Sequence, residues 1–222
     1  MTDEDIARPD VVPQSDAGRV AAVLDAGGVV ALPGVGGYFL AAKAGVLEAE
    51  ERLTELAADP EGPHYVAADR AAASQLASGW NEEIDRLLER CWPGPLELFV
   101  SRATAAGQHA AESPEGGWAI VIGTPEGRAL RKLCREHGPW RAVPLVFADA
   151  AEVAQAFDVR DVSLVVDGGR CEGPSPTVVD ATVTPLRVLR EGALPANFVE
   201  GAALMAARRR ISMFRRRHED DE

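Results

Sequence analysis

Apolar residues recur along the chain with two spacings, one typical of amphipathic helices and one typical of buried strands. The clearest helix is predicted over 81–92, where apolar side chains stand at i, i+3, i+4 and i+7 and Asn81 can cap the first turn. Helical spacing predicts further helices over 17–26, 44–57, 125–137, 150–157 and 197–217. Short apolar runs predict strands over 29–33, 96–100, 118–122, 142–147, 162–166, 177–179 and 187–189.

Glycine and proline mark several ends of these elements. Thr124 can cap the helix after the 118–122 strand, Pro125 suits its first helical position, and Gly138 can end it. The Gly34–Gly37 loop after the first strand permits two interpretations. It could bind a dinucleotide phosphate, but the third glycine of that fingerprint and a following Gly-Lys-Ser/Thr are both missing. The pattern therefore favours a tight connecting loop.

Strands and helices alternate over 17–195 without a linker, which predicts one α/β domain rather than two. We assign 17–200 to this domain. Residues 1–16 are polar and contain prolines, so we expect a flexible N-terminal segment. Residues 103–117, rich in Ala, Gly and Glu, are expected to form a loop within the domain. Residues 201–222 are expected to form a basic C-terminal helix and an acidic tail.

Composition narrows the class of protein. The chain has 222 residues, 46% of them apolar, which is enough material for a sizeable core. No apolar stretch approaches the ~20 residues needed to span a bilayer, and the acidic N-terminus is not followed by the apolar core of a signal peptide. We therefore expect a cytoplasmic protein. The three cysteines form no C-x-x-C pair and the four histidines lack metal-ligand spacing, so no disulfide framework and no metal site are predicted.

Charge is unevenly distributed along the chain. The net charge is −12, yet residues 208–222 carry six arginines against four acids, so the remainder carries −14. Such an acidic body repels a phosphate backbone at long range. Any RNA affinity is therefore predicted to lie mainly in the tail, and its candidate RNA contacts are Arg208, Arg209, Arg210, Arg215, Arg216 and Arg217. The alternative is a solvated helix end, neutralised by the acids at 219–222.

Five short motifs, in the same order and at similar spacing, resemble the YrdC-like family of threonylcarbamoyl-AMP synthases across about residues 18–200. In this chain they read G-V-V-A-L-P-G-V-G-G-Y-F-L (28–40), W-P-G-P-L-E (92–97), V-D-G-G (166–169), P-T-V-V-D (176–180) and L-R-E-G (189–192). The resemblance implies a twisted, mostly mixed sheet flanked by helices, in a single domain with a concave groove. In that family the groove binds ATP, threonine and bicarbonate, and the product serves to modify a tRNA adenosine. Double-stranded RNA or tRNA binding is also attributed to it.

Few of the family's ligand-contacting positions are retained. Tyr38, Thr177 and Arg190 match it and are the ligand-binding residues that the resemblance implies. The family's other motifs are replaced: its Lys-x-Arg by 56–58, its Arg-x-Pro by 123–125, its Ser-Ala-Asn by 144–146, the threonine of its P-T-D-T by Gly34, and a serine by Pro176, with Ser175 one position away. The apolar replacements Leu56, Leu145 and Val146 predict a drier, partly filled groove.

Two functions follow from these losses. In the first, the protein has lost catalysis, so no catalytic residue is assigned, and it binds a nucleotide, RNA or a partner protein through the groove. In the second, it is an active nucleotidyltransferase that uses ATP and Mg²⁺ and has replaced the lost cations. The candidate replacements are Lys43, Arg52 and Arg141, because they lie close to altered motifs.

Overall fold

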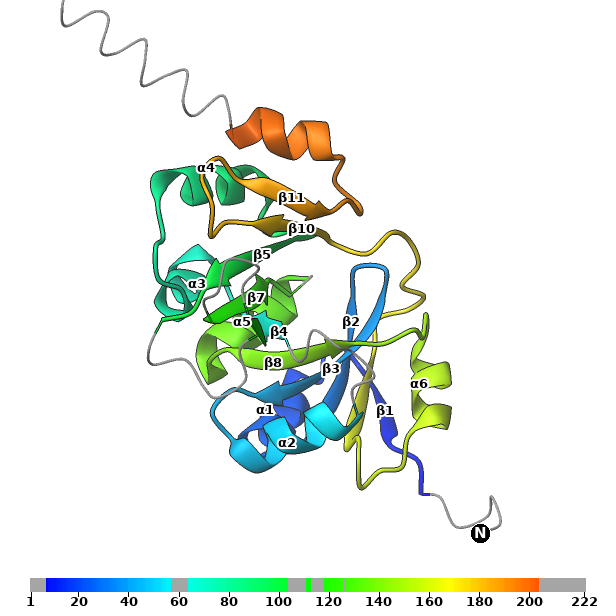
Figure 1. The fold of residues 1–222 in the computed structure, drawn as a ribbon. Coiled ribbons are helices and arrows are strands. Elements are labelled where there is room, and N and C mark those ends of the chain that lie inside the picture. Colours follow the sequence, from blue (N-terminus) through cyan, green and yellow to red (C-terminus); the bar gives the residue numbers. More distant parts are fainter. Residues whose placement is uncertain (1–6, 57–63, 104–110, 113–117, 126, 204–222) are drawn as a thin grey trace, which may run out of the picture.

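The computed structural model of the protein describes residues 7–56, 64–103, 111–112, 118–125 and 127–203 (Figure 1). These residues form one α/β domain built on a single mixed sheet. Helices flank the sheet, as the sequence predicts.

Eleven strands of the described residues join in that sheet. They are β1 (Asp10–Pro13), β2 (Val30–Gly34), β3 (Gly37–Lys43), β4 (His64–Val66), β5 (Leu96–Ser101), β6 (Ala111–Glu112), β7 (Trp118–Gly123), β8 (Trp140–Pro144), β9 (Leu164–Asp167), β10 (Thr177–Asp180) and β11 (Arg187–Arg190). Their order is β1-β9-β2-β3-β8-β4-β7-β5-β10-β11, with β6 beside β7. The pairs β1–β9, β2–β9, β4–β7 and β5–β10 are parallel and the others antiparallel.

The helices are α1 (Ala17–Asp25), α2 (Leu47–Leu56), α3 (Arg70–Leu76), α4 (Glu82–Cys91), α5 (Arg128–His137) and α6 (Ala150–Ala156), and residues 196–203 are also helical.

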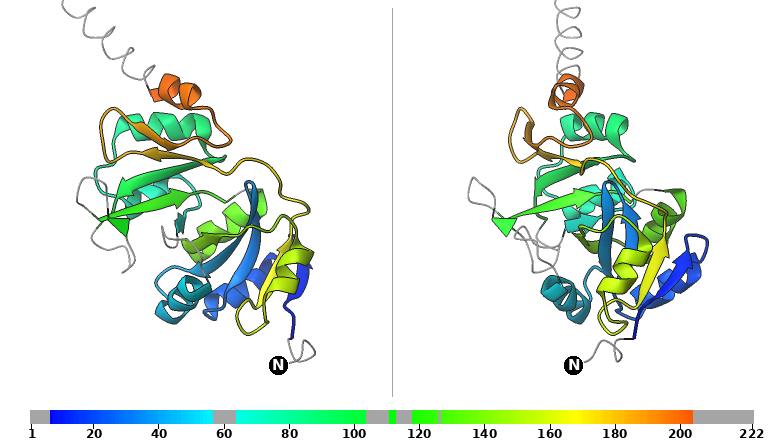
Figure 2. Two further views of the ribbon diagram at one scale, coloured as in Figure 1. Left: turned by 45° about the vertical axis from the view of Figure 1, so that its right-hand side comes forward. Right: turned by 90° about the vertical axis from the view of Figure 1, so that its right-hand side faces the viewer.

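Side chains of a strand alternate between the two faces of a sheet, so the residues of β2 belong to two different hydrophobic cores. Val30 and Leu32 pack with α1 and α5, whereas Ala31 packs with α2 and α6. A third core lies between β5, β7 and β10 and the helices α3, α4 and 196–203. Of these helices, α4 and 196–203 lie at the opposite end of the molecule from β1 (Figure 2).

Several predicted boundaries are confirmed. The Asn81 side chain accepts hydrogen bonds from the N–H groups of Glu83 and Ile84 and so caps α4. Gly138 ends α5 with a φ of 89°, a conformation that residues with a Cβ atom rarely adopt. Gly34 pairs with Gly37, so Val35 and Gly36 form the two-residue turn of a β2–β3 hairpin. The tight-loop interpretation of this glycine cluster is thus correct.

Other boundaries differ from the sequence prediction. α5 begins at Arg128 rather than at Pro125, with Gly127 as its N-cap, and Thr124 and Pro125 are not helical and line the cleft described below. β8 begins at Trp140, whose side chain is fully buried, and ends at Pro144. The strands β3 and β4 and the helix α3 were not predicted, since β4 has only three residues and the alanine-containing sequences of β3 and α3 have no clear spacing.

The N-terminal assignment also needs correction. Residues 10–13 belong to the sheet, because β1 pairs in parallel with β9 and the Val12 side chain is buried. The pairing satisfies backbone groups that would otherwise face water at this edge. The folded domain therefore begins before residue 17. Of the predicted C-terminal helix, the structure describes only residues 196–203, and the remainder lies outside the described residues.

Candidate functional site

A cleft of ≈ 170 Å³ opens between the ends of several strands and their connecting segments. Its walls come from the β2–β3 hairpin, β4, the chain around the start of β5, the β7–α5 connection, the end of β8, residues 175–176 and Arg190 of β11. Most of the stretches that carry the family resemblance or depart from it therefore meet in one place. They are far apart in sequence, and the sheet order brings them together.

The charged side chains among the described residues that line this cleft are Glu97 and Arg190, with His64 beside them. Glu97 and Arg190 both neighbour Val178 across adjacent strands, so their side chains lie on the same face of the sheet. The Arg190 Nη2 atom lies 3.8 Å from Glu97 Oε2, and His64 Nδ1 lies 3.6 Å from the same oxygen. The cleft thus contains a carboxylate directly beside its arginine.

Gly123 gives Glu97 the space it occupies. A Cβ atom at position 123 would lie 3.3 Å from the Glu97 Cγ atom, closer than side chains normally approach. In the family motif this position carries an arginine, and position 97 carries a threonine. The two replacements are therefore structurally coupled: the arginine side chain is gone and a carboxylate stands in the adjacent space.

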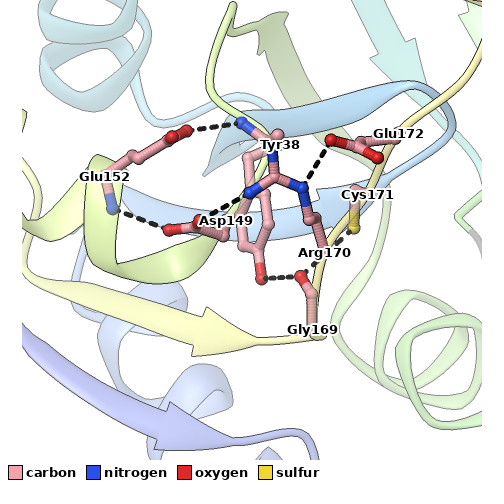
Figure 3. A network of polar contacts seen from close by, with 8 residues as sticks. Tyr38, Asp149, Glu152, Gly169, Arg170, Cys171 and Glu172 are labelled. Atoms are coloured by element: carbon pink, nitrogen blue, oxygen red, sulfur yellow. Dashed lines mark hydrogen bonds and ion pairs between the residues drawn. The ribbon is translucent and has the colours of Figure 1, made fainter.

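Tyr38 lines the cleft, and its hydroxyl group holds the turn after β9 (Figure 3). This hydroxyl accepts a hydrogen bond from the Gly168 N–H at 2.9 Å and donates one to the Gly169 carbonyl at 3.0 Å. The side chain is buried, and burial raises the pKa of the phenol above its ordinary value. Tyr38 therefore anchors the turn that follows β9.

The connection between β9 and β10 (residues 168–176) is fixed at further points. Arg170 pairs with Asp149 at the start of α6 and with Glu172 (Figure 3). The Cys171 N–H donates to the Ala148 carbonyl at 2.7 Å. Gly36, at the tip of the hairpin, touches the backbone of this connection so closely that a Cβ atom would lie 3.0 Å from two carbonyl oxygens. The connection is thus held against the hairpin and α6, and its end contributes Ser175 to the cleft wall.

Thr177 is a second matched position with a structural role. Its side chain is fully buried, and its hydroxyl donates to the Leu194 carbonyl at 2.7 Å. The same oxygen accepts hydrogen bonds from the N–H groups of Gly192 and Leu194 at 3.0 and 2.9 Å. With these three bonds the hydroxyl orients the loop after β11, which follows Arg190. Of the three matched residues, Tyr38 and Arg190 line the cleft, whereas Thr177 does not.

The three candidate replacement cations lie elsewhere. Lys43 pairs with Asp25 at 2.6 Å, and Arg52 donates to the Arg160 carbonyl at 3.0 Å. Neither residue lines the cleft. In the described arrangement each of them contacts a group outside the cleft, so their role as replacement cations stays a prediction.

Arg141 is buried within the domain instead of facing the cleft. Its side chain is 1% exposed, its Cζ atom lies 4.1 Å from the centre of the Tyr65 ring, and its Nε atom lies 4.0 Å from Glu50 Oε2. Burial lowers the pKa of this guanidinium from its ordinary value. Since Tyr65 forms part of the cleft wall, Arg141 supports that wall from behind.

The apolar replacements are only partly in the cleft. Leu145 lines it, but Val146 is 96% exposed and Leu56 packs against the core beneath α2 and α6. Of the three, only Leu145 lines the cleft, so a contribution of Leu56 or Val146 to filling the groove is not seen in the described arrangement. Sequence reasoning gave no role to Glu97 or His64. The signal for Glu97 was present, because it replaces the threonine of a recognised motif.

The remaining sequence predictions concern the C-terminal arginines, a metal site and a membrane span. The arginines Arg208, Arg209, Arg210, Arg215, Arg216 and Arg217 lie outside the described residues. In the described part of the chain, no group of three His, Cys, Asp or Glu side chains is arranged to hold a metal ion. None of the helices described there has the length and apolar character to cross a bilayer.

Comparison with solved structures identifies the fold. A variant of P. abyssi Sua5 superposes with a TM-score of 0.74 at 23% identity, over 87% of this chain and 60% of that one. The complex of P. abyssi Sua5 with L-threonine gives a TM-score of 0.73 at 24% identity, over 89% and 60% of the two chains. E. coli YciO gives 0.73 at 21% identity, over 86% and 95%. The chain thus spans 60% of the length of the Sua5 structures.

Sequence comparison gives one short match and one long match. The short match is to a type III pantothenate kinase of Halorhodospira halophila, at 38% identity over 78 residues, which is 31% of each protein. The long match is to the model of the Sua5/YciO/YrdC family, described as telomere recombination, and it covers residues 22–192. Because that match includes most of the domain and all five motifs, the chain belongs to the Sua5/YciO/YrdC family.

Proposed function

We propose that this protein is a YrdC-like domain that binds a small ligand in its cleft and has lost the synthesis of threonylcarbamoyl-AMP. The observation that carries the proposal is the charge of the cleft. Glu97 stands 3.8 Å from Arg190, and the three cations that could have replaced the family's Lys and Arg residues do not line the cleft.

A nucleoside triphosphate brings several negative charges into such a site, and phosphoryl chemistry depends on cations that stabilise them. Each lost charge-assisted contact costs about 1.5–3 kcal/mol. Three such losses, if they act in the transition state, slow the reaction by at least ~10³-fold. A carboxylate beside the remaining arginine adds repulsion.

The size and polarity of the cleft fit a smaller ligand. Its volume of ≈ 170 Å³ is below the about 300–1,000 Å³ of typical sites for drug-sized molecules. Arg190 and Glu97 offer one positive and one negative group close together, which suits a zwitterion such as an amino acid. L-Threonine is bound in the P. abyssi Sua5 complex, and it is the first ligand to test here.

The alternative function is an active threonylcarbamoyl-AMP synthase that uses ATP and Mg²⁺. The residues at the cleft do not fit a magnesium-bound triphosphate, because Arg190 is opposed by Glu97 and no second cation of the described residues lines the walls.

Pyrophosphate release separates the two functions. The protein is incubated with ATP, L-threonine and bicarbonate beside P. abyssi Sua5 as an active reference, and we expect no threonine-dependent release of pyrophosphate.

Titration calorimetry with L-threonine then tests whether the cleft binds this ligand, and we expect Arg190→Ala to weaken the binding. Leu56→Lys combined with Ala58→Arg is expected not to restore turnover, since the Ser-Ala-Asn segment is still missing. Robust pyrophosphate release that disappears in Arg52→Ala would overturn the proposal and establish the alternative.

A further inference from the structure

His64 places a buried imidazole in the wall of the cleft. It belongs to β4, which pairs with β7 on one side and with β8 on the other. The His64 side chain is 8% exposed, and its Nδ1 atom lies 3.6 Å from Glu97 Oε2. Because both edges of β4 are held in the sheet, the ring keeps its place beside the carboxylate.

Two groups approach the same oxygen of Glu97. His64 Nδ1 lies 3.6 Å and Arg190 Nη2 lies 3.8 Å from Oε2. Both distances are longer than the about 2.7–3.2 Å of a hydrogen bond from nitrogen to oxygen. The oxygen is buried and accepts no hydrogen bond within the described part of the chain. At these distances a full charge still attracts the carboxylate, whereas a neutral ring contributes little. The charge of the imidazole therefore decides which group Glu97 pairs with.

The two groups differ in how freely they can move. Arg190 ends β11, the last strand of the sheet, and its side chain is 48% exposed. It can turn toward a ligand without disturbing the core. The enclosed His64 ring cannot turn away in the same manner. When His64 holds the carboxylate, Arg190 is thus the group that is released.

Other charged or titratable side chains reach this region from β3, β4, β8 and α5. They include Tyr38, Tyr65, Arg131, Cys134 and Arg141. Arg141 stands opposite Tyr65 and so lies on the other face of the sheet from His64. Guanidinium groups stay charged, and phenols and buried thiols stay neutral, between about pH 5 and about pH 8. An imidazole ordinarily changes its charge in that range.

We propose that His64 sets the charge of the ligand that the cleft accepts. With an uncharged ring, Glu97 pairs with Arg190, and the two suit the zwitterion of the proposed function, on which this inference rests. With a protonated ring, Glu97 pairs with His64, and two positive charges stand against one negative charge. Arg190 is then available to an anion. The anion affinity of the cleft thus rises as the pH falls through the range in which His64 takes up its proton.

Sulfate is the probe for this behaviour, because its charge stays constant over the range of about pH 5.5 to about pH 8 in which imidazoles titrate. Titration calorimetry of the full chain is expected to give an affinity about tenfold higher at the lower pH, a factor typical of coupled sites. Since coupling is reciprocal, sulfate must also favour protonation of the protein. Calorimetry in two buffers of different ionisation enthalpy should therefore show proton uptake on binding.

Two variants separate the parts of this mechanism. His64→Gln keeps a polar side chain that does not titrate, so the sulfate affinity should stay low at both pH values and proton uptake should disappear. Glu97→Gln removes the shared carboxylate, so sulfate should bind tightly at both pH values. If the protonated ring only added a positive charge, the pH effect would persist in Glu97→Gln.

The matched control is His137→Gln. His137 Nδ1 lies 2.8 Å from Asp25 Oδ2, so this variant also breaks a contact between an imidazole and a carboxylate, but outside the cleft. It should retain the about tenfold change of affinity and the proton uptake. A pH effect caused by the general loss of negative charge would instead be the same in all three variants.

Three results would overturn the inference: equal sulfate affinity at both pH values in the unmodified protein, an undiminished pH effect in His64→Gln, or an undiminished one in Glu97→Gln. L-Threonine binding separates this failure from that of the proposed function. If L-threonine binds while sulfate affinity ignores pH, the inference alone is wrong, and if neither binds at either pH, both are wrong. Circular dichroism establishes that each variant is folded. Should His64→Gln not fold, Glu97→Gln decides whether the pH effect depends on the shared carboxylate.

Discussion

Arg190 and Glu97 face one another in the cleft, with the arginine Nη2 atom 3.8 Å from the glutamate Oε2 atom. The arginine side chain is 48% exposed and the glutamate 18% exposed, so the carboxylate is the more enclosed partner. An incoming anion must compete with a fixed neighbouring carboxylate for the same guanidinium. Glu97 therefore acts against phosphate binding at this position.

Replacing Glu97 should reverse that effect. Glu97→Thr puts the family's motif residue in place, removes one negative charge from the cleft and leaves Arg190 free for an anion. Since like charges at close range cost several kcal/mol, we expect pyrophosphate to bind at least about tenfold more tightly. Calorimetric titration with pyrophosphate measures the change. The control is Glu51→Thr on the exposed side of α2, which should leave the affinity unchanged. Equal affinity in the Glu97 variant and the unmodified protein would show that the carboxylate does not govern anion binding.

Sequence patterns predicted the elements whose spacing is unambiguous. The helix α4 has both a clear apolar face and a capping Asn81, and both were found. The hairpin strand β3 was missed, because its alanines and single lysine fit strand, helix and loop equally well. The strand β4 was missed, because its three residues are too few to show a spacing. β1 was missed for another reason. A four-residue strand with one buried side chain depends on its partner β9, which lies far away in sequence.

For the site, the sequence showed which positions are matched but not what their side chains contact. Tyr38 and Thr177 are matched, yet their hydroxyl groups bind backbone atoms of residues 168–169 and 192–194. Hydrogen bonds between segments so far apart in the chain cannot be read from spacing. The same limit applied to Lys43 and Arg52, which are close to altered motifs in sequence but not to the cleft in space.

The role of Thr177 can be tested by comparing two substitutions. Thr177→Val keeps the shape but leaves the N–H groups of Gly192 and Leu194 without their acceptor. An unsatisfied buried donor costs about 1–3 kcal/mol, so we expect a loss of about 2–4 kcal/mol in the free energy of unfolding. Thr177→Ser keeps the hydroxyl and loses one methyl group, which is worth about 0.8 kcal/mol. Urea unfolding measures both. Similar stability of the two variants would mean that the hydroxyl does not hold this loop.

The anchor that Tyr38 provides should be visible in a comparable experiment. Tyr38→Phe removes the acceptor of the Gly168 N–H and should lower the free energy of unfolding by about 1–3 kcal/mol. Arg170→Gln is the matched comparison, because it breaks exposed ion pairs of the same connection. The Arg170 side chain is 60% exposed, and such pairs contribute about 0–1 kcal/mol. Thermal unfolding measures the stability of both variants. If Arg170→Gln proved the more destabilising, Tyr38 would not be the main anchor of this connection.

The three cysteines should differ in reactivity according to their burial. Cys134 is buried between α5 and the sheet, and burial raises the pKa of its thiol to about 12. Burial also raises the pKa of the Cys91 thiol on α4. Since the thiolate is the reactive form, a raised pKa leaves almost none of it at pH 8, and packing blocks access as well. Cys171, in the β9–β10 connection, is partly exposed.

We therefore expect iodoacetamide at pH 8 to modify Cys171 in the folded protein and to reach Cys91 and Cys134 only after unfolding in urea. Peptide mass spectrometry over time gives the three rates separately, and Cys171→Ser serves as the control that should remove the fast reaction. Raising the pH through the range below 12 should speed the reaction of Cys134 only slightly while the fold persists, because its thiolate fraction grows but its access does not. Rapid modification of Cys134 at pH 8 would show that α5 separates readily from the sheet, and the packing described for this helix would then be wrong.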